Sequence, residues 1–446
     1  MTDRARPTRR TVLAGTTGLV GLGFPALVGR AKEFDGVTLN VATYQHVFSS
    51  HLKEYLPEFE ASTGMKVNFQ VQAFPVYNQQ ADLELSVKGS AYDVCNITYI
   101  YASRWIEAGW LSNLEPLLAD RNLTPPDWDP KDFLAGAQLP LQDKSGATHG
   151  FAWEGGAMVM GIARADILEK KGLAIPKTFD ELQNVARETH GTDGVAAYVN
   201  DRLHHWHWVP FDMGFGGKVF RDPPNDLALV LDSPEAVRAA EYYVELLTKY
   251  APSGVLSYTE DQALRAQMSG RANIRTHSVT WFMPLVQNPD SKVAPTTRIA
   301  MVPSGPAGAF PGANCQGYGI PVNAKNKKAS WEWMKWAVGK ELSARIVKDK
   351  GHVSICRRSV IDSDAYRTLM QVNGTDVADL YLRVLQDKGS EGYMRYRTVP
   401  TFPQVGDKIN KAIERIASRQ QGAAEAMKQA QAEALSDLQK AGVTAR

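Results

Sequence analysis

The chain has 446 residues, of which 44% are hydrophobic and 22% are charged. This is the composition of a globular protein, and the length is enough for two hydrophobic cores. The formal net charge is +2, but residues 1–31 hold five Arg and one Asp, a net +4, so the remaining chain carries −2. Such a weakly acidic chain lacks the basic face typical of proteins that bind nucleic acid or an anionic membrane.

Residues 1–31 are typical of an export signal. Arg9 and Arg10 form a basic start, an uncharged run follows over positions 11–29, and small residues at its end suit cleavage. A transmembrane anchor is the alternative, but five Gly and Pro25 make this run a poor membrane-spanning helix. The paired arginines favour the twin-arginine pathway. No Cys lies near the cleavage region to accept a lipid, so we expect a freely diffusing periplasmic protein.

After this signal, strands and helices alternate. Alternating apolar residues from Val37 predict a strand, helical spacing over 52–59 predicts a helix that Gly64 ends, and alternation from Met65 predicts the next strand. Such a strand–helix–strand unit implies a parallel pair with a right-handed crossover. The pattern continues with a helix around 78–88, a strand at Tyr92–Ile97 and a helix at Ala102–Ala108, which Gly109 ends.

The second part of the chain alternates in the same way around two loop-rich segments. Turn-forming residues dominate Asp120–Pro130, and Gly and Pro are so frequent in Pro303–Gly319 that we expect a loop there too. Thr178 with Glu181 predicts a capping box at one helix start, and Ser233-Pro234 predicts another start. The other predicted elements are a strand around Gly150–Ala163 and helices at 328–340 and 423–440. Alternation over about 400 residues exceeds one core, so we expect two α/β lobes.

Common catalytic and redox motifs are missing from the sequence. Its cysteines, Cys95, Cys315 and Cys356, show no C-x-x-C spacing, which argues against a redox motif and a Cys-based zinc site. One disulfide is compatible with an oxidising compartment, and the sequence does not decide which pair would form it; buried free thiols are the favoured interpretation. No G-x-S-x-G, H-E-x-x-H, G-x-G-x-x-G or P-loop sequence occurs. We therefore expect neither an enzyme nor a cofactor.

A series of short motifs runs along the whole mature chain. They are Phe59-Glu60-Ala61-Ser62-Thr63-Gly64, Tyr92-Asp93-Val94, Glu107-Ala108-Gly109-Trp110-Leu111, His149-Gly150-Phe151-Ala152, Ile175-Pro176-Lys177-Thr178-Phe179-Asp180-Glu181-Leu182, Gly216-Gly217-Lys218-Val219-Phe220, Gly317-Tyr318-Gly319-Ile320-Pro321 and Ala426-Met427-Lys428-Gln429-Ala430. Each is weak alone. In their order and spacing they resemble the extracellular solute-binding proteins of sugar ABC importers, the family that includes maltodextrin-binding protein.

The resemblance implies an α/β, two-lobed periplasmic-binding-protein fold, with hinge-linked lobes and a ligand cleft between them. The protein would act as a monomer that closes over a solute and delivers it to the transmembrane subunits of an ABC permease. By the family's chain path, lobe one takes 36–150 and 318–360, lobe two takes 151–314 and 361–446, and the hinge lies near His149–Trp153 and Asn314–Gly319.

Candidate binding residues follow from the chemistry of a sugar. Its apolar faces stack on aromatic rings, and its hydroxyls bond to planar polar side chains. The carboxyl ends of parallel strands are the usual place for such groups in α/β sheets. The candidates there are Tyr44, Gln45 and His46 after the first strand, Asn96, Tyr99 and Tyr101 after the strand at 92–97, and Trp153 with Glu154 beside the predicted hinge.

The most conspicuous cluster is His204-His205-Trp206-His207-Trp208. His204 and His207 would share a helical face and could ligate zinc or copper, but only Asp201 and Asp212 offer nearby carboxylates, so we expect no metal. The family's register aligns Trp206 with an aromatic that stacks on sugar, and His204 is a weaker candidate. Trp208 and Phe211 are expected in the core.

The remaining candidates lie nearer the carboxyl terminus. Trp281 matches a stacking Trp of the family, and Asn314 and Gln316 at the second crossing are candidate hydroxyl partners. Phe402 lies in a region that supplies an aromatic in some relatives. The amphipathic spacing of Trp331, Trp333 and Trp336 favours core packing over binding.

These residues together favour a neutral, hydroxyl-rich solute: a sugar, an oligosaccharide or a polyol. A cationic solute such as a polyamine is the alternative, but it would need several acids among the aromatics, and the sequence shows only Glu154. A secreted glycoside-acting enzyme would need two facing carboxylates, and again only Glu154 has a strong claim to the cleft.

Overall fold

The computed structural model describes residues 34–223, 225–388, 396, 399 and 401–442. The predicted export signal lies outside these residues. Of the helices in this part of the chain, none is long and apolar enough to cross a membrane.

One mixed sheet runs through the described part of the chain. Its strands are β1 Thr38–Tyr44, β2 Lys66–Gln72, β3 Val94–Thr98, β4 Gly150–Ile162, β5 Ala196–Tyr198, β8 Ala272–Ser278, β9 Arg298–Ala300 and β10 Ala313–Gly319. Their order is β2-β1-β3-β10-β4-β8-β5, with β9 paired to β4. The predicted parallel pairing of β1 with β2 is confirmed. Two short hairpins are β6 Phe220–Asp222 with β7 Asp226–Leu229, and β11 Gln371–Val372 with β12 Thr375–Asp376.

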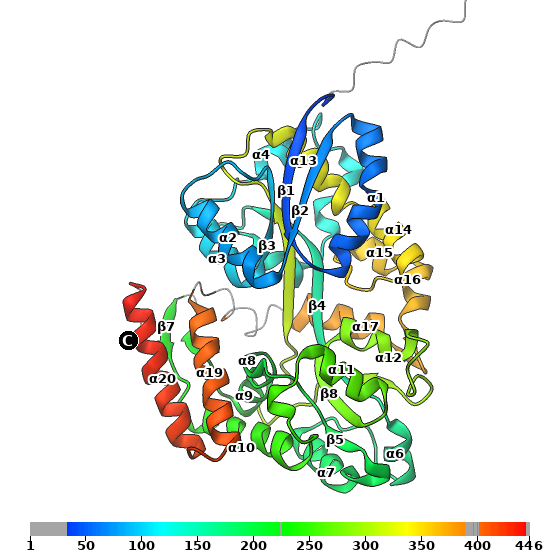
Figure 1. Ribbon diagram of the computed structural model, residues 1–446, viewed down its shortest axis with the longest axis vertical. Helices are drawn as coiled ribbons and strands as arrows, with labels where there is room; N and C mark the ends of the chain where they lie inside the picture. The colour runs from blue at the N-terminus through cyan, green and yellow to red at the C-terminus, as the bar shows by residue number, and fades with distance from the viewer. Residues whose placement is uncertain (1–33, 224, 389–395, 397–398, 400, 443–446) are drawn as a thin grey trace, which may run out of the picture.

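Strands β4 and β10 join the two halves of the molecule. All 13 residues of β4 are buried; its first half pairs with β10, and from Met158 onward it pairs with β8. In Figure 1 both strands run vertically between an upper group that contains β1, β2 and β3 and a lower group that contains β5 and β8. The predicted hinge segments fall within β4 and β10 and at their ends.

Strand β10 corrects one prediction from the sequence. The loop expected over Pro303–Gly319 ends at β10, so the prediction was wrong for positions 313–319. The glycines of this stretch serve close packing: a Cβ at Gly317 would lie 2.5 Å from a methyl of Leu141, and one at Gly319 would lie 2.5 Å from a methyl of Ile97. Glycine here leaves room for neighbouring side chains and does not mark a turn.

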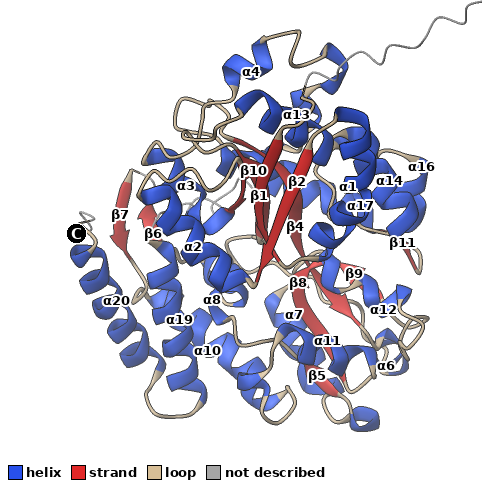
Figure 2. Ribbon diagram, turned by 45° about the horizontal axis from the view of Figure 1, so that its top comes forward, coloured by secondary structure: helices blue, strands red, loops and turns tan. Residues whose placement is uncertain are grey.

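Helices cover both faces of the sheet. They are α1 Val47–Thr63, α2 Phe74–Ser86, α3 Tyr99–Glu107, α4 Glu115–Ala119, α5 Ala135–Gln138, α6 Ala165–Lys170, α7 Phe179–Thr189, α8 His204–His207, α9 Val209–Phe215, α10 Pro234–Lys249, α11 Glu260–Met268, α12 Met283–Gln287, α13 Lys327–Ala337, α14 Lys340–Lys350, α15 Arg358–Ile361, α16 Asp364–Leu369, α17 Val377–Leu382, α19 Phe402–Ala417 and α20 Ala423–Lys440. Figure 2 shows α2 and α3 on one side of β1 and β2, with α1 and α14 on the other.

The helix termini follow the sequence signals with one exception. Gly64 ends α1 in the left-handed conformation, at φ 82°. The Ser233 hydroxyl accepts the Ala236 N–H at 3.1 Å at the start of α10. Thr178 accepts the Glu181 N–H, but the Glu181 carboxylate accepts the N–H of Lys177 and not that of Thr178. The predicted capping box is therefore wrong in its second hydrogen bond.

Several predicted core residues are confirmed. Trp208, Trp331 and Trp333 are fully buried, and Phe211 is 2% exposed, whereas Trp336 is half-buried. The three cysteines are buried free thiols. Burial raises the pKa of Cys95 to about 12, so this thiol is unreactive at neutral pH.

The end of the chain returns to both groups of elements. Helices α15 and α16 pack on α14, hairpin β11–β12 contacts β9, and α19 and α20 pack on α10. Figure 1 shows α19 and α20 side by side at the left edge. The lobe boundary at 360/361 stays a prediction.

Candidate functional site

A cavity of about 110 Å³ lies where the crossing strands meet the ends of β3 and β8. Tyr99 follows β3 directly, Glu154 and Asn314 belong to β4 and β10, and Glu260 is the first residue of α11. The lining residues are Tyr99, Glu154, Leu203, His205, Trp206, Glu260, His277, Ser278, Thr280, Trp281 and Asn314. Elements of the upper group, the lower group and the strands between them thus meet at one cavity.

Aromatic rings form one wall of this cavity. The Tyr99 and Trp206 ring centroids are 6.5 Å apart, those of Trp206 and His277 are 6.4 Å apart, and those of His277 and Trp281 are 5.4 Å apart. Behind this wall, the Arg275 guanidinium lies 5.7 Å from the Trp281 ring centroid. The rings offer the apolar, polarisable surface on which C–H faces of a sugar or polyol pack.

Glu154 carries a carboxylate into the cavity from β4. The residue is 8% exposed, and its Oε1 lies 3.6 Å from Nε2 of His46. Burial raises the pKa of the Glu154 carboxyl; His46 opposes this rise, and the charge of Glu260 reinforces it. Asn314, in the neighbouring strand, has a buried Oδ1 without a hydrogen-bond partner in the described part of the chain. Both groups are positioned to accept hydrogen bonds from a ligand.

Glu260 and His277 form a second acid–histidine pair at the cavity. The His277 Nε2 lies 3.2 Å from Oε1 of Glu260, and its Nδ1 accepts the Ser278 N–H at 2.7 Å. Burial lowers the pKa of His277 to about 4, with the nearby Arg275 adding to the effect, so this imidazole is neutral at pH 7. Because Nδ1 is an acceptor, the ring proton lies on Nε2 and faces the carboxylate.

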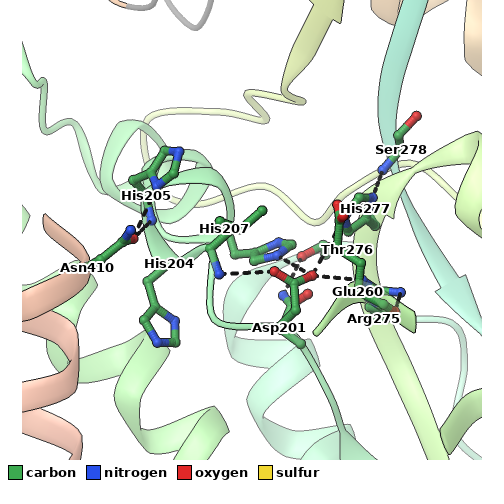
Figure 3. A network of polar contacts seen from close by, with 12 residues as sticks. Asp201, His204, His205, His207, Glu260, Arg275, Thr276, His277, Ser278 and Asn410 are labelled. Atoms are coloured by element: carbon green, nitrogen blue, oxygen red, sulfur yellow. Dashed lines mark hydrogen bonds and ion pairs between the residues drawn. The ribbon is translucent and has the colours of Figure 1, made fainter. Parts of the chain in front are cut away.

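Asp201 connects the two segments that carry the aromatic wall of the cavity, the segment of His207 and the segment of Arg275 (Figure 3). Its Oδ2 accepts from Nη2 of Arg275 at 2.7 Å and from Nε2 of His207 at 3.0 Å, and its Oδ1 accepts the Leu203 N–H at 3.0 Å. Burial alone would raise the pKa of Asp201, but His207, His277 and Arg275 hold it well below its ordinary value. Asp201 is therefore an ionised, buried anchor.

Asp201, His207 and His277 are the described residues whose ligand atoms lie close enough to hold a metal ion, within 4.8 Å of one another. Arg275 argues against that role, because its guanidinium occupies the same Asp201 oxygen that a cation would use. Figure 3 also shows His204 pointing away from Asp201; its Nδ1 lies 3.3 Å from the Tyr243 hydroxyl. The arrangement fits a structural ion-pair network better than a metal centre.

Five of the residues proposed from the sequence line the cavity together: Tyr99, Glu154, Trp206, Trp281 and Asn314. His46 lies behind them, against Glu154. Gln45 is exposed at the end of β1, and Tyr101 is half-buried against Trp105. These two do not line the cavity.

Four other proposed residues are packed inside the fold. Trp153 stacks on Phe48 at 4.7 Å and donates its indole N–H to Oδ1 of Asn96 at 2.8 Å. Tyr44 is buried beside that indole, at 6.2 Å between ring centroids. Gln316 is 4% exposed in β10. These residues are not among those that line the cavity, and their direct ligand contact stays a prediction.

The sequence reasoning missed Glu260, His277 and His205, all of which line the cavity. Glu260 follows Thr259, whose capping box with Gln262 starts α11; that cap is visible in the sequence as a helix start. His277 is the next-to-last residue of β8 and lies four residues before Trp281, so a predicted strand there would have placed it at the same edge. His205 contacts Asn410 of α19, a long-range contact with no local signal.

Comparison with known proteins shows similarity to one family of binding proteins. A family model for the bacterial extracellular solute-binding proteins matches residues 46–343. The erythritol/L-threitol-binding protein of Mycolicibacterium smegmatis is 21% identical over 370 residues, which cover 77% of this chain and 75% of that one. The mannitol-binding protein of Pseudomonas aeruginosa is 22% identical over 431 residues, which cover 91% and 94%.

Among solved structures, an ABC transporter solute-binding protein from Agrobacterium radiobacter K84 in complex with ribitol superimposes with a TM-score of 0.77. It is 22% identical in sequence, and the match covers 90% of this chain and 99% of that one. At that identity the comparison shows the shared two-lobed fold.

Proposed function

We propose that this chain, which belongs to the bacterial extracellular solute-binding proteins, is the periplasmic binding component of an ABC importer for a small polyol or single sugar. The observation that carries the proposal is the cavity where both lobes meet. Its wall of aromatic rings and its polar rim from β4, β10 and the end of β8 suit a ligand with C–H faces and hydroxyls.

The size of the cavity narrows the ligand class. Its volume of about 110 Å³ is small beside the roughly 300–1,000 Å³ of sites for drug-sized molecules. This favours a four- to six-carbon polyol or one sugar ring over an oligosaccharide. The polyols named for relatives of this chain, erythritol, mannitol and ribitol, are of that size.

The carboxylates of Glu154 and Glu260 serve binding in this proposal. A carboxylate accepts hydrogen bonds through two oxygens, so it suits neighbouring hydroxyls of a polyol chain. Two acids in one cavity also meet a first requirement for glycoside hydrolysis. Since the matching family consists of transport binding proteins, we assign no catalytic step, and an aryl glycoside incubated with the protein should release no product.

The proposal includes export, lobe closure and delivery to a permease. Export follows from the signal predicted at 1–31, and closure from the two strands that connect the lobes. The permease would recognise the closed form, because only in that form do both lobes contribute to one continuous surface.

A thermal-shift panel tests the ligand class. The mature protein is heated with four- to six-carbon polyols, with monosaccharides, and with maltose and maltotriose. A ligand that binds only the folded state at a hundred times its Kd adds about 2.7 kcal/mol of stability, so Tm should rise for one or more small polyols or monosaccharides. A rise for maltotriose alone would overturn the size argument.

A further inference from the structure

Two carboxylates line the cavity, and no Lys or Arg lines it in the part of the chain that the structure describes. Glu154 enters from β4 and Glu260 from the start of α11. Each lies near a histidine nitrogen, Nε2 of His46 for Glu154 and Nε2 of His277 for Glu260.

His46 approaches Glu154 from the start of α1. It caps α1: its Nδ1 accepts the Phe48 N–H at 3.1 Å. Accepting that N–H uses the lone pair of Nδ1, so the other ring nitrogen, Nε2, is the atom that faces Glu154. Nε2 lies 3.6 Å from Oε1 of Glu154, beyond hydrogen-bond distance. His46 therefore gives the Glu154 carboxylate no hydrogen bond.

His277 is held in one tautomer by its own neighbour. The Ser278 N–H donates to Nδ1 at 2.7 Å, and Nε2 faces Oε1 of Glu260 at 3.2 Å. The burial that lowers the pKa of this ring to about 4 acts in the same direction as that hydrogen bond. The neutral His277 ring therefore supplies no counter-charge to Glu260.

The Arg275 guanidinium, whose Nη1 donates to the main-chain carbonyl of Glu260 at 3.4 Å, already has a carboxylate partner. Its Nη2 lies 2.7 Å from Oδ2 of Asp201, and both side chains are 1% exposed or less. The two opposite charges cancel, and the guanidinium lies behind the Trp281 ring. It therefore does not neutralise Glu154 or Glu260.

Glu154 is where the missing counter-charge matters most. The residue is 8% exposed, and among the described residues its one recorded polar contact is the 3.6 Å approach of His46. Burying a carboxylate without a cation or a full set of hydrogen bonds is costly, and closure of the lobes would remove more water from it. A neutral guest supplies hydroxyl donors but no charge.

We propose that the solute carries a protonated amine as well as hydroxyls, and that its ammonium group lies between the carboxylates of Glu154 and Glu260. The ligand class is then an amino polyol or a small amino sugar. The Tyr99, Trp206 and Trp281 rings beside the two acids favour a cation as well, since an ammonium is attracted to an aromatic face. This inference rests on the proposed function and specifies the ligand further.

Isothermal titration with matched ligands tests it. Four-, five- and six-carbon polyols are compared at pH 7 with their 1-amino-1-deoxy derivatives, such as sorbitol with glucamine. The best amine should bind at least about tenfold tighter than its parent polyol, because it adds a charge-assisted contact to the buried carboxylate of Glu154. The preference should fall as the pH passes the pKa of the ligand amine.

Two variants locate the effect. Glu260→Gln and Glu154→Gln keep the side-chain shape and remove one charge, so each should reduce the amine preference to about the level of the parent polyol. Glu188→Gln, a charge removed from the exposed face of α7, is the matched control and should keep the full preference. Thermal melts of each variant show that the fold is intact.

The outcomes separate this inference from the proposed function. Neutral polyols that bind as tightly as the amines, or tighter, overturn the ammonium site and leave the polyol transporter standing. If no member of either series binds, the proposed function itself fails. An amine preference that Glu154→Gln and Glu260→Gln both leave unchanged would place the cation elsewhere and also overturn the inference.

Discussion

Trp281 offers the clearest single-residue test of the cavity. Its ring is half-buried and lies 5.4 Å from the His277 ring on the cavity wall. Trp281→Ala removes a stacking surface but little of the packed core, so we expect an affinity loss of about 1–3 kcal/mol, or roughly fivefold to more than a hundredfold. Isothermal titration with the ligand from the thermal-shift panel measures this.

Trp110 is the matched control for that substitution. It too is half-buried and has an arginine over its ring, with Arg104 at 5.5 Å, but it lies in the upper group, away from the cavity lining. Trp110→Ala should leave the affinity within about twofold of the parent, since a residue outside the site changes no ligand contact. Equal affinity losses for both variants would remove Trp281 from the site.

For single residues, the sequence could predict which types of side chain form the site better than it could predict the direction in which each side chain points. Trp153 and Glu154 are adjacent in a strand that is buried on both faces, so no polar–apolar alternation shows which one faces the ligand. The structure turns Glu154 into the cavity and packs Trp153 on Phe48. Tyr99 and Tyr101 are likewise equal candidates in the sequence, and only the helix that contains both residues determines which way each side chain points.

At the scale of elements, the Asp201 side chain connects helix α8 with the end of strand β8. Asp201→Asn removes the charge that pairs with the buried Arg275 guanidinium, and breaking a buried pair in this way costs about 3–5 kcal/mol. Asp166→Asn breaks a pair with Arg164 that is partly exposed, so we expect a loss of at most about 1 kcal/mol. Urea unfolding at pH 7 compares the two variants.

The same substitution has a defined pH dependence. Asp201 has a folded-state pKa below its ordinary value of 3.8, so the unfolded chain binds its proton first on acidification. The stabilisation is fully present above about pH 3.8 and is lost as the pH falls through the lower folded value. The stability gap between the parent and Asp201→Asn should therefore stay constant from pH 8 to pH 5. A gap that closes near pH 6.5 would assign the effect to a histidine.

Element boundaries were predictable where a local signal fixes them. Gly64 and Ser233 mark helix ends through backbone conformation and one side-chain hydrogen bond, both visible in a few residues. Strand β10 could not be predicted in this way, because Gly and Pro are on average typical of turns. Gly317 and Gly319 are instead required by close packing against Leu141 and Ile97, which are distant in sequence. Such contacts exist only after the sheet has formed.

For the whole molecule, the two-lobed architecture follows from alternation of strands and helices over more residues than one core accommodates. The sequence could not show that the lobes share one continuous sheet. That depends on β4, which pairs with β10 in its first half and with β8 in its second. The cavity is formed by residues of both lobes and of these shared strands. A ligand in it would therefore contact the segments about which the lobes would rotate.

Lobe closure is a prediction about the molecule as a whole. A ligand that contacts Tyr99 of the upper group and Trp206 and Trp281 of the lower group stabilises the form in which these groups are close, so binding should shift the population toward closure. Small-angle X-ray scattering should then show a smaller radius of gyration with the polyol that raises Tm most than without ligand. A polyol that leaves Tm unchanged serves as the control and should leave the radius unchanged. If the radius stays constant at saturation while titration shows full binding, the ligand enters a site formed in advance, and the permease would have to recognise the loaded protein by another feature.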